Sequence, residues 1–365
     1  MVYRVIGLMS GSSLDGLDIV FAELQEKSGN WSYEVRAATT YPYENGWVEK
    51  LTGAIRLSAG DYLLLHTAYG HYCGEQVNRF IEAYQLQYQA QLIASHGHTT
   101  FHAPVNKMTG QLGDGAAIAA VTGINVVSDL RAMDIALGGH GAPIVPIGER
   151  LLLKEFPLFL NLGGIANVSF NGDDKHIGFD VCPANRVLNM LVQNEGRTYD
   201  DGGAISASGN VIPSLLDLLN NLEYYRMPYP KSLSNDFGTD VVYPLIRNAT
   251  RNTADGLRTY TEHIAVQISN AVALLHASFP IAIGKCCFTG GGAHNHFLTE
   301  RIRDRLNETG VEAIVPGYPL VDFKEALIMG LIGVLRWREE NNVLASVTGA
   351  TRDSIGGAVW IGQEA

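Results

Sequence analysis

The chain opens with YRVIGLMSGSSLDGLDIVFA (residues 3–22), in which two apolar runs flank a turn rich in glycine, serine and aspartate. This pattern predicts a strand, a tight turn and a second strand. Gly7, Gly11 and Gly16 free the backbone to turn sharply and to approach a ligand closely. The hairpin is therefore the first candidate for a binding site.

The composition of this turn suits a nucleotide's phosphates together with Mg²⁺. Backbone N–H groups and serine hydroxyls hold phosphate oxygens, and a carboxylate such as Asp15 or Asp18 holds the cation directly or through water. A Walker A loop needs a lysine and opens a helix, and a dinucleotide fingerprint needs GxGxxG before a helix, so the turn is neither. An ordinary Gly/Ser/Asp hairpin is the alternative.

Composition excludes several classes of protein. With 46% hydrophobic and 17% charged residues over 365 positions, the chain is globular and long enough for two domains with a cleft between them. A net charge of -11 and the absence of a Lys/Arg run argue against nucleic acid as a partner. We expect no secretory signal, because residues 1–4 lead straight into a strand without a charged n-region and an apolar h-region. We also expect no membrane partner, because the longest apolar block, Ala326 to Trp337, is too short to span a bilayer. Four cysteines without a CxxC pair fit neither a zinc site nor a disulfide framework, so we expect a cytoplasmic protein.

Strands and helices alternate along both halves of the chain, which predicts an α/β fold. A loop rich in helix and strand breakers (130–146) marks the expected domain junction. Beyond it, the segment 156–170 repeats the opening order of strand, glycine turn and strand. We therefore expect two halves of one design: an N-terminal domain (1–130), which the returning segment 340–365 completes, and a second domain (131–339).

A third glycine turn follows a predicted strand at 281–288 and precedes a helix that runs through Leu306. Strand, triple glycine and helix together form a ligand turn. The opening turn and Gly163-Gly164 are suited to a phosphate chain, and Gly290-Gly291-Gly292 lets an adenosine lie against backbone. Three such turns at comparable positions favour a nucleotide, and a phosphotransferase is the leading reaction class.

Several polar residues each allow two explanations. Asp180 follows a strand, where a carboxylate can project into a cleft, but it could instead cap the helix that follows. His96, His98 and His102 could bind a metal, contact a sugar or simply pack; their spacing lacks a carboxylate or cysteine partner.

Charged residues further along the chain are equally open. Arg131 and Asp134 flank the expected cleft, or form an ion pair that holds their loop. Glu325 lies at the start of an apolar helix, where it could bind substrate or simply interact favourably with the helix dipole.

Taken together, these segments resemble the anhydro-N-acetylmuramic acid kinase family, within the superfamily of actin, heat-shock chaperones and sugar kinases. GLMSGSSLDGLD (residues 7–18) is similar to the family's MSGTSxDGxD turn, with Ser12 in place of threonine. SHGHTTFHAP (95–104) resembles its SHGQT segment, with His98 in place of glutamine. The long run 111–146, NLGGIANVSF (161–170), TGGGAHN (289–295) and SVTGAT (346–351) match as well, so the resemblance runs nearly end to end.

The resemblance implies two RNase H-like α/β domains around an interdomain cleft. It also implies ATP-dependent conversion of 1,6-anhydro-N-acetylmuramic acid, with water, into N-acetylmuramic acid 6-phosphate during peptidoglycan recycling. Asp180 matches the catalytic aspartate, which would deprotonate the attacking water, and Asp15 would hold Mg²⁺, directly or through water. A homodimer is what the family suggests.

The remaining site residues are assigned in two groups. Nucleotide contacts are expected from the opening turn, from the second glycine turn and from the third: Gly11, Ser12, Ser13, Leu14, Asp15, Gly16, Leu17, Asp18, Gly163, Gly164, Gly290, Gly291, Gly292 and Asn295. Substrate contacts are expected from His96, Arg131, Asp134, Asn185 and Glu325.

The sequence departs from the family pattern near Asp180. Where the family has D-x-GPGN, this chain has Asp180 followed by VCPAN (181–185). Asn189 stands where the family usually has aspartate, and His140 replaces a glutamine. The alternative within the enzyme class is therefore a kinase of another 1,6-anhydro sugar, such as a levoglucosan-like hexose. From a different class, the same fold serves as a nucleotide-driven conformational module without sugar chemistry, against which the presence of Asp180, Arg131 and Glu325 argues.

Overall fold

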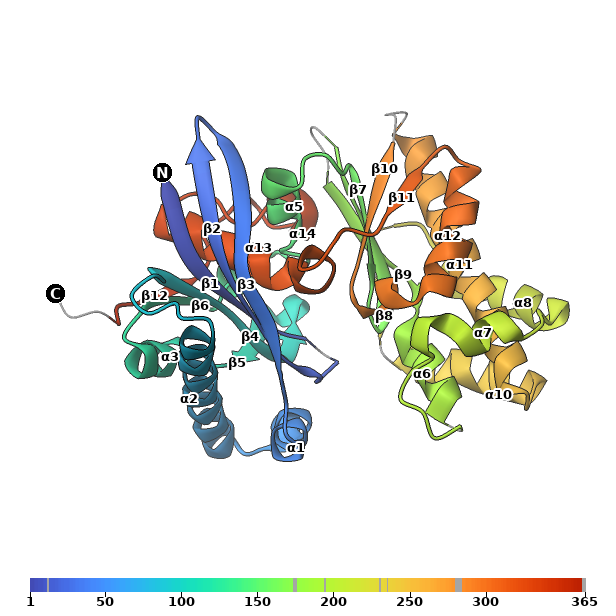
Figure 1. Ribbon diagram of the computed structural model, residues 1–365, viewed down its shortest axis with the longest axis horizontal. Coiled ribbons are helices and arrows are strands. Elements are labelled where there is room, and N and C mark those ends of the chain that lie inside the picture. Colours follow the sequence, from blue (N-terminus) through green and yellow to red (C-terminus); the bar gives the residue numbers. More distant parts are fainter. Residues whose placement is uncertain are drawn as a thin grey trace. The chain divides into compact units, whose positions relative to one another are not determined.

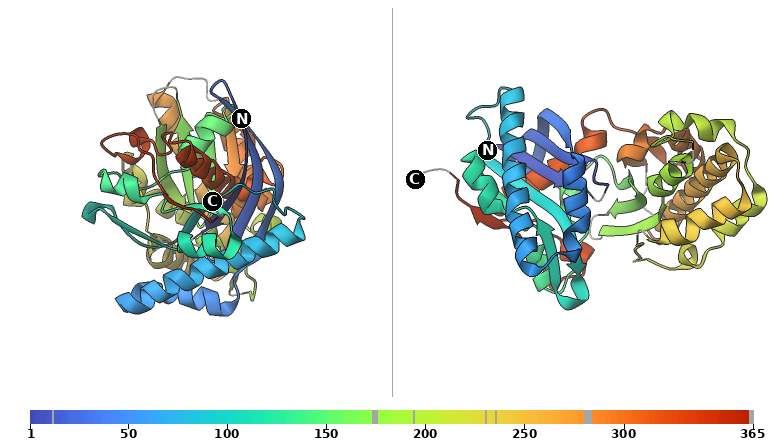
Figure 2. Two further views of the ribbon diagram at one scale, coloured as in Figure 1. Left: turned by 90° about the vertical axis from the view of Figure 1, so that its left-hand side faces the viewer. Right: turned by 90° about the horizontal axis from the view of Figure 1, so that it is seen from below.

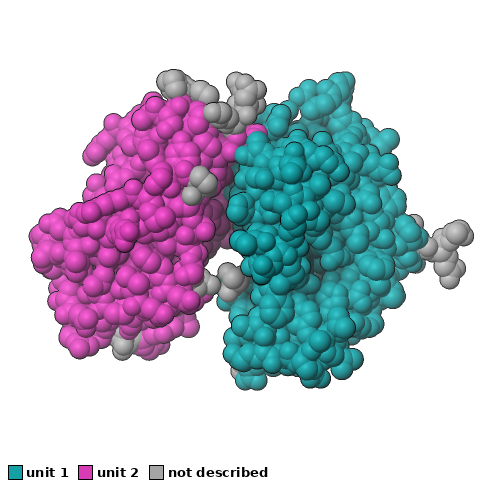
Figure 3. All heavy atoms as spheres, turned by 180° about the vertical axis from the view of Figure 1, so that it is seen from behind, with its two compact units in different colours: residues 1–154, 323–365 teal, residues 155–322 magenta. Residues whose placement is uncertain are grey.

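The computed structural model describes residues 1–11, 13–172, 176–193, 195–229, 231–234, 236–279 and 284–362. Contacts divide the chain into two compact units (Figures 1 and 3). Unit 1 consists of Met1–Lys154 and Phe323–Ala365, and unit 2 consists of Glu155–Asp322. Each unit has its own sheet.

The sheet of unit 1 begins with the predicted hairpin. Strands β1 and β2 pair antiparallel, β3 extends the meander, and β4 and β6 lie parallel to β1 on its other side. The order is β12-β6-β4-β1-β2-β3, and β5 pairs with β4. The strands are β1 (Val2–Ser10), β2 (Gly16–Lys27), β3 (Asn30–Pro42), β4 (Leu92–Ala103), β5 (Met108–Leu112), β6 (Asn125–Ser128) and β12 (Ala358–Trp360).

Helices cover both faces of this sheet (Figure 2). Because side chains alternate along a strand, Ile6 and Leu8 of β1 join the apolar cluster beneath α2, whereas Val5 and Gly7 face α13. This explains why β1 reads as a continuous apolar run. The helices that include residues of unit 1 are α1 (Asn45–Gly53), η1 (Ala54–Arg56), α2 (Ala59–Ala83), η2 (Pro104–Asn106), α3 (Gly115–Thr122), α4 (Ala132–Ala136), α5 (Pro146–Leu152), α13 (Leu320–Trp337) and α14 (Ala345–Thr348).

The sheet of unit 2 repeats the same design. Its order is β11-β10-β7-β8-β9, with β7, β8 and β9 antiparallel and β10 and β11 parallel to β7. Its strands are β7 (Leu158–Leu162), β8 (Ile165–Asn171), β9 (His176–Pro183), β10 (Lys285–Thr289) and β11 (Glu312–Ile314). Its helices are α6 (Asn185–Gln193), η3 (Asp201–Gly203), α7 (Ala204–Ser208), α8 (Pro213–Asn220), α9 (Glu223–Arg226), η4 (Phe237–Val242), α10 (Tyr243–Ala249), α11 (Thr253–Ser278), η5 (Gly291–His294) and α12 (His296–Asn307).

Both sheets therefore contain a three-stranded meander followed by two parallel strands beside its first strand, which is the RNase H-like arrangement, and the sheet of unit 1 adds β5 and β12. The predicted fold class, α/β with two such sheets, is confirmed. The predicted strand at 281–288 is seen from Lys285, and Ile281, Ala282 and Ile283 lie outside the described residues.

The units divide the chain after Lys154 and after Asp322, whereas the sequence pattern places the junctions after 130 and 339. Long-range contacts explain the difference. Asp134 accepts a hydrogen bond from Thr348 Oγ1 at 2.6 Å, and Lys324 Nζ lies 2.6 Å from Glu149 Oε1 in a buried ion pair. The loop after residue 130 and most of α13 thereby belong to unit 1. Among the described residues, no helix is both long and apolar enough to span a membrane.

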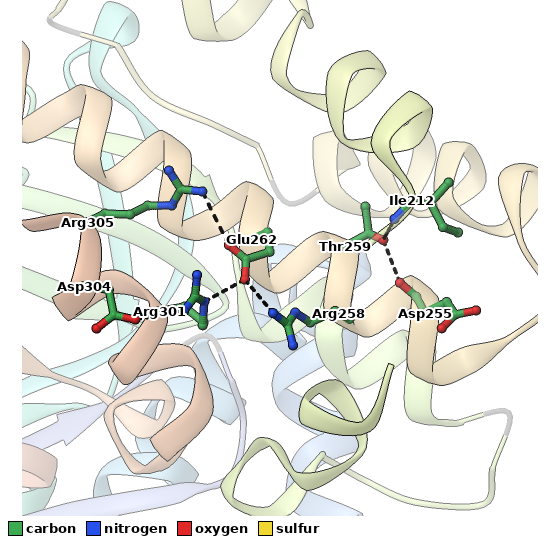
Figure 4. Close-up of polar contacts among 8 residues, drawn as sticks. All are labelled: Ile212, Asp255, Arg258, Thr259, Glu262, Arg301, Asp304 and Arg305. Atoms are coloured by element: carbon green, nitrogen blue, oxygen red, sulfur yellow. Dashed lines mark hydrogen bonds and ion pairs between the residues drawn. The ribbon is translucent and has the colours of Figure 1, made fainter. Parts of the chain in front are cut away.

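In unit 2 a buried glutamate fixes the helix that follows the triple-glycine turn (Figure 4). Glu262 of α11 lies 3.3 Å from Arg258, 2.7 Å from Arg301 and 3.4 Å from Arg305, and the last two belong to α12. A buried carboxylate is tolerated only when it is paired in this way. The cluster therefore holds α12, and with it the turn at the start of α12, against α11.

Gly7 is a sharp test of the contact between β1 and α13. A Cβ at Gly7 would lie 1.9 Å from the carbonyl oxygen of Ala326. We expect Gly7→Ala to lower the free energy of unfolding by at least about 2 kcal/mol, because the obstacle is backbone that cannot turn aside. Urea denaturation measures the change.

Gly46 provides the matched control, because a Cβ there would meet nothing within 4 Å. It lies in α1, so Gly46→Ala should stabilise the protein by up to about 1 kcal/mol. Equal effects of the two substitutions would contradict the close approach.

Candidate active site

The opening turn joins β1 to β2 over Gly11 to Asp15. Ser13 Oγ donates to Asp15 Oδ1 at 2.7 Å, and the Asp15 side chain is exposed. Leu14 has a φ of 59°, a conformation that a leucine adopts only where the surrounding structure enforces it. Such strain is typical of a functional turn.

The nucleotide contacts predicted for residues 11–18 do not all lie in this turn. Gly11, Ser13, Leu14 and Asp15 do, and Ser12 lies outside the described residues. The other three of these eight residues belong to β2: Gly16 packs against the Tyr41 carbonyl, Leu17 is buried in the core, and Asp18 accepts from Thr40 Oγ1 at 2.5 Å.

Buried polar side chains lie at the base of the turn. Ser10 Oγ lies 3.0 Å from His98 Nδ1 and accepts from the Tyr43 hydroxyl at 2.8 Å. The Tyr43 hydroxyl also bonds the Tyr69 hydroxyl. Burial raises the pKa of both tyrosines, so both phenols stay protonated.

A second polar group in unit 1 centres on Arg131. His96 Nδ1 lies 2.8 Å from the Gly97 carbonyl and donates to it, so Nε2 is free to accept from Arg131 Nε at 2.7 Å. Burial, and then the charge of Arg131, lower the pKa of His96 to about 3. Arg131 Nη1 donates to the Gly141 carbonyl at 2.5 Å. A neutral histidine thus orients a charged guanidinium.

Burial lowers the pKa of Arg131 to about 10, and the negative charges of Glu325 and Asp134 oppose that change. Glu325 is half-buried and follows Phe323, where α13 departs from helical geometry (φ -112°, ψ 15°). Its neighbour Lys324 pairs with Glu149. Unit 1 therefore brings Arg131, His96 and Glu325 together from three separate segments.

Asp134 holds its loop rather than presenting a free carboxylate. Oδ2 accepts from the Gly141 N–H at 2.7 Å, and Oδ1 accepts from Thr348 Oγ1 at 2.6 Å. A Cβ at Gly139 would lie 2.2 Å from Oδ2, so the loop closes tightly around the carboxylate. Asp134 therefore positions the carbonyl of Gly141, to which Arg131 bonds.

In unit 2 the two remaining glycine turns are neighbours, because β7 and β10 are parallel and Asn161 pairs with Thr289. Gly290 has a φ of 84°, and a Cβ on Gly292 would lie 2.8 Å from Asn185 Oδ1. The carbonyl of Gly163 accepts from the Asn185 N–H at 3.1 Å. Backbone is thus the main surface that these turns offer.

Two asparagines expected to contact ligands also have local partners. Asn185 Nδ2 donates to the Leu162 carbonyl at 2.9 Å and joins the glycine turns. Asn295 Oδ1 accepts from the Leu298 N–H at 2.9 Å and caps α12.

Asp180 lies within β9, so it does not cap α6, which begins at Asn185. Its Oδ2 accepts from the Leu233 N–H at 2.9 Å, and the Tyr224 hydroxyl donates to its backbone carbonyl at 2.6 Å. Burial raises the pKa of Asp180, and the Leu233 hydrogen bond partly offsets this. A carboxylate of this kind is a stronger base than an exposed one.

The three histidines at 96, 98 and 102 do not converge on one point. His96 bonds Arg131, His98 bonds Ser10, and His102 Nδ1 lies 3.1 Å from Thr109 Oγ1. Within the described part of the chain, no three His, Cys, Asp or Glu side chains are placed to hold a metal ion.

A family model described as anhydro-N-acetylmuramic acid kinase matches residues 3–362. The chain belongs to the anhydro-N-acetylmuramic acid kinase family. A relative of this name from Sulfurovum sp. (strain NBC37-1) is 32% identical over 370 residues, covering 98% of this chain and 99% of the relative. Another, from Synechococcus elongatus, is 33% identical over 382 residues, with coverage of 98% and 99%.

Among solved structures, the Acidaminococcus fermentans (R)-2-hydroxyglutaryl-CoA dehydratase component A aligns over 91% of this chain and 97% of that chain, with 14% identity and a TM-score of 0.47. At that TM-score the likeness supports no conclusion. Family membership makes the protein an ATP-dependent kinase of an anhydro sugar, which confirms the predicted family, enzyme class and activity.

Some residues that shape the site carry no local signal in the sequence. Tyr43, Tyr224 and Leu233 lie far along the chain from the residues they hold, Ser10 and Asp180. None of them belongs to a sequence motif, and only their long-range contacts in the structure identify them.

The raised pKa of Asp180 leads to a test by stability. Ionising this carboxyl costs stability as the pH rises above its unfolded-state pKa, because the folded protein binds the proton more tightly. We expect Asp180→Asn to be more stable than wild type near neutral pH, and the gain to shrink as the pH falls toward about 3, where the unfolded carboxyl is mostly protonated too.

Urea denaturation at both pH values checks this expectation, and Asp15→Asn, at an exposed carboxylate, is the control that should show no such gain. A destabilised Asp180→Asn protein at neutral pH would contradict it.

Proposed function

We propose that the protein opens 1,6-anhydro-N-acetylmuramic acid with water and phosphorylates its O6 with ATP, giving N-acetylmuramic acid 6-phosphate and ADP. Oxygen of water bonds to the anomeric carbon while the bond from that carbon to O6 breaks. O6 then bonds to the γ-phosphorus, ADP leaves, and the proton of water passes to a base. The observation that carries the proposal is Asp180, in a chain of this family. Its carboxylate is partly buried and accepts a hydrogen bond through one of its two oxygens, Oδ2.

Asp180 is the proposed base. The Leu233 N–H occupies Oδ2, and no hydrogen bond to Oδ1 is found among the described residues, so Oδ1 is the atom available to water. The Tyr224 hydroxyl, bonded to the Asp180 carbonyl, steadies the strand on which the base lies. A fixed base with a raised pKa meets both requirements of general base catalysis, reach and proton affinity.

Arg131 and Glu325 are the proposed sugar contacts. The guanidinium of Arg131, oriented by neutral His96, suits the lactyl carboxylate of the substrate. Glu325 offers acceptors for sugar hydroxyls. Asp134 acts through the loop that supports Arg131, as its two hydrogen bonds indicate.

The opening turn and Gly163-Gly164 are the proposed phosphate contacts, and Gly290-Gly291-Gly292 is the proposed adenosine contact. The donor set fits Mg²⁺ that arrives with ATP: one exposed carboxylate, Asp15, beside the hydroxyl of Ser13, and no protein cage among the described residues. Bound there, Mg²⁺ would neutralise charge on the phosphoryl oxygens.

Two of the departures from the family pattern, Cys182 and Ala184, do not favour another sugar. Both replace glycines and are fully buried in the core of unit 2, where they change packing rather than a surface that a substrate could reach. On family membership, the substrate is proposed to be the one that names the family.

We expect Asp180→Asn to lower turnover by at least about a hundredfold, because no base remains to accept the proton of water. ADP release with ATP, Mg²⁺ and 1,6-anhydro-N-acetylmuramic acid measures the change. ATP affinity, measured by calorimetry, should stay near the wild-type value. Near-normal turnover of the folded variant would contradict the assignment.

We further propose a cytoplasmic homodimer. The four cysteines include no CxxC pair and all are buried, as suits a reducing compartment. Exposed apolar side chains gather on the first turns of α2 and on the adjoining β4–β5 hairpin, where the rings of Tyr62 and Phe101 lie 5.4 Å apart. Leu63 and Leu64 are 63% and 72% exposed, which favours this face as the contact between copies.

Leu63→Glu should shift the protein from dimer to monomer, because a charge in an apolar contact must be desolvated. Analytical ultracentrifugation reports the state. Leu218→Glu, at an exposed leucine of α8, is the matched control and should leave the dimer intact. A wild-type monomer would overturn the proposal.

A further inference from the structure

A buried hydrogen-bond chain runs beneath the opening turn and ends at His98. It passes from the Tyr69 hydroxyl to that of Tyr43, then to Ser10 Oγ at 2.8 Å and to His98 Nδ1 at 3.0 Å. Ser10 and His98 are partners in the parallel β1–β4 ladder, and His98 is only 7% exposed. The chain therefore links four separate segments at the base of the turn: β1, the residue after β3, α2 and β4.

Tyr43 holds both ends of this turn. Its hydroxyl donates to Ser10, the last residue before the turn, and its backbone N–H donates to the Asp15 carbonyl at 3.3 Å. The position of His98 relative to the turn is thereby fixed through Ser10.

The chain also favours one tautomer of His98. Ser10 Oγ accepts the Tyr43 proton, and its own proton has His98 Nδ1 as an acceptor at 3.0 Å. Burial lowers the pKa of His98, which favours the neutral ring. The single ring proton is then on Nε2, and no partner for Nε2 is found in the described part of the chain.

His98 Nε2 is not among the buried polar atoms that lack a partner in the described part of the chain, so its N–H is open to a ligand. We propose that His98 donates its Nε2–H to the phosphoryl group that the enzyme transfers, and is a further catalytic residue of the phosphate site. This rests on the proposed function, which takes the opening turn as that site. The hydrogen bond from Ser10 holds the ring before the reaction, so the donor needs little reorganisation when charge develops.

The family's SHGQT segment has glutamine where this chain has His98. A glutamine amide and a neutral imidazole share one property that an apolar side chain lacks, an N–H donor. The exchange of one for the other is what a hydrogen bond to an anion would allow.

The test compares His98→Gln with His98→Met, two side chains of similar length of which only glutamine carries an N–H donor. Steady-state kinetics are measured with ATP and 1,6-anhydro-N-acetylmuramic acid, and folding is checked by circular dichroism. We expect kcat of the methionine variant to fall about 100-fold, as on loss of one donor to a developing anion, and kcat of the glutamine variant to stay near wild type. KM for the sugar should stay unchanged in both.

Equal kcat values for the two folded variants would overturn the inference. A change confined to KM for the sugar would also overturn it, because His98 would then be a sugar contact.

If His98→Met does not fold, Ser10→Ala takes its place. This substitution removes the hydrogen bond to His98 Nδ1, so the ring is no longer held in one tautomer. We expect kcat to fall with KM for the sugar unchanged, and an unaltered kcat would overturn the inference. Failure of the wild-type protein to release ADP in a sugar-dependent way would instead overturn the proposed function, and this inference with it.

Discussion

The close approach of α13 to β1 is the constraint on which the candidate sugar site of unit 1 depends. Glycines line the contact: a Cβ on Gly7 would meet the Ala326 carbonyl at 1.9 Å, and a Cβ on Gly330 would lie 3.2 Å from a methyl group of Val5. Because Glu325 directly precedes Ala326, the packing that seats the helix also determines where the carboxylate lies. The buried Lys324–Glu149 pair fixes the same turn of α13 from the side of α5. Fold and site therefore share one set of contacts.

Burial shifts the pKa values of two residues of the candidate site, His96 and Asp180, in opposite directions. In unit 1 it keeps His96 neutral, so that the ring accepts from Arg131 and leaves the guanidinium with the positive charge. In unit 2 it raises the pKa of Asp180, which makes that carboxylate a better base. The first effect favours binding of an anion and the second favours removal of a proton. Under the proposed function, the two effects meet two different requirements of the reaction.

Local patterns predicted much of this structure, and long-range contacts account for most of what they did not. The strand–turn–strand order at residues 3–22 and the glycine turns follow from neighbouring residues alone, as does the repeat of one design. The unit boundaries depend on pairs such as Asp134 with Thr348, separated by 214 positions, which no local pattern reveals. The same holds for Leu233, whose N–H reaches Asp180 across 53 positions. Gly16 and Leu17 read as part of the turn, but pairing with β3 draws them into β2.

The most direct test of the account is the fate of water oxygen. The protein is incubated with ATP, Mg²⁺ and 1,6-anhydro-N-acetylmuramic acid in ¹⁸O-labelled water, and the products are identified by mass spectrometry. The account predicts a ring-opened sugar 6-phosphate with the label at the anomeric carbon and none in the phosphate. Label in inorganic phosphate without labelled sugar phosphate would mean that water attacks ATP instead, and would contradict coupled hydrolysis and phosphorylation.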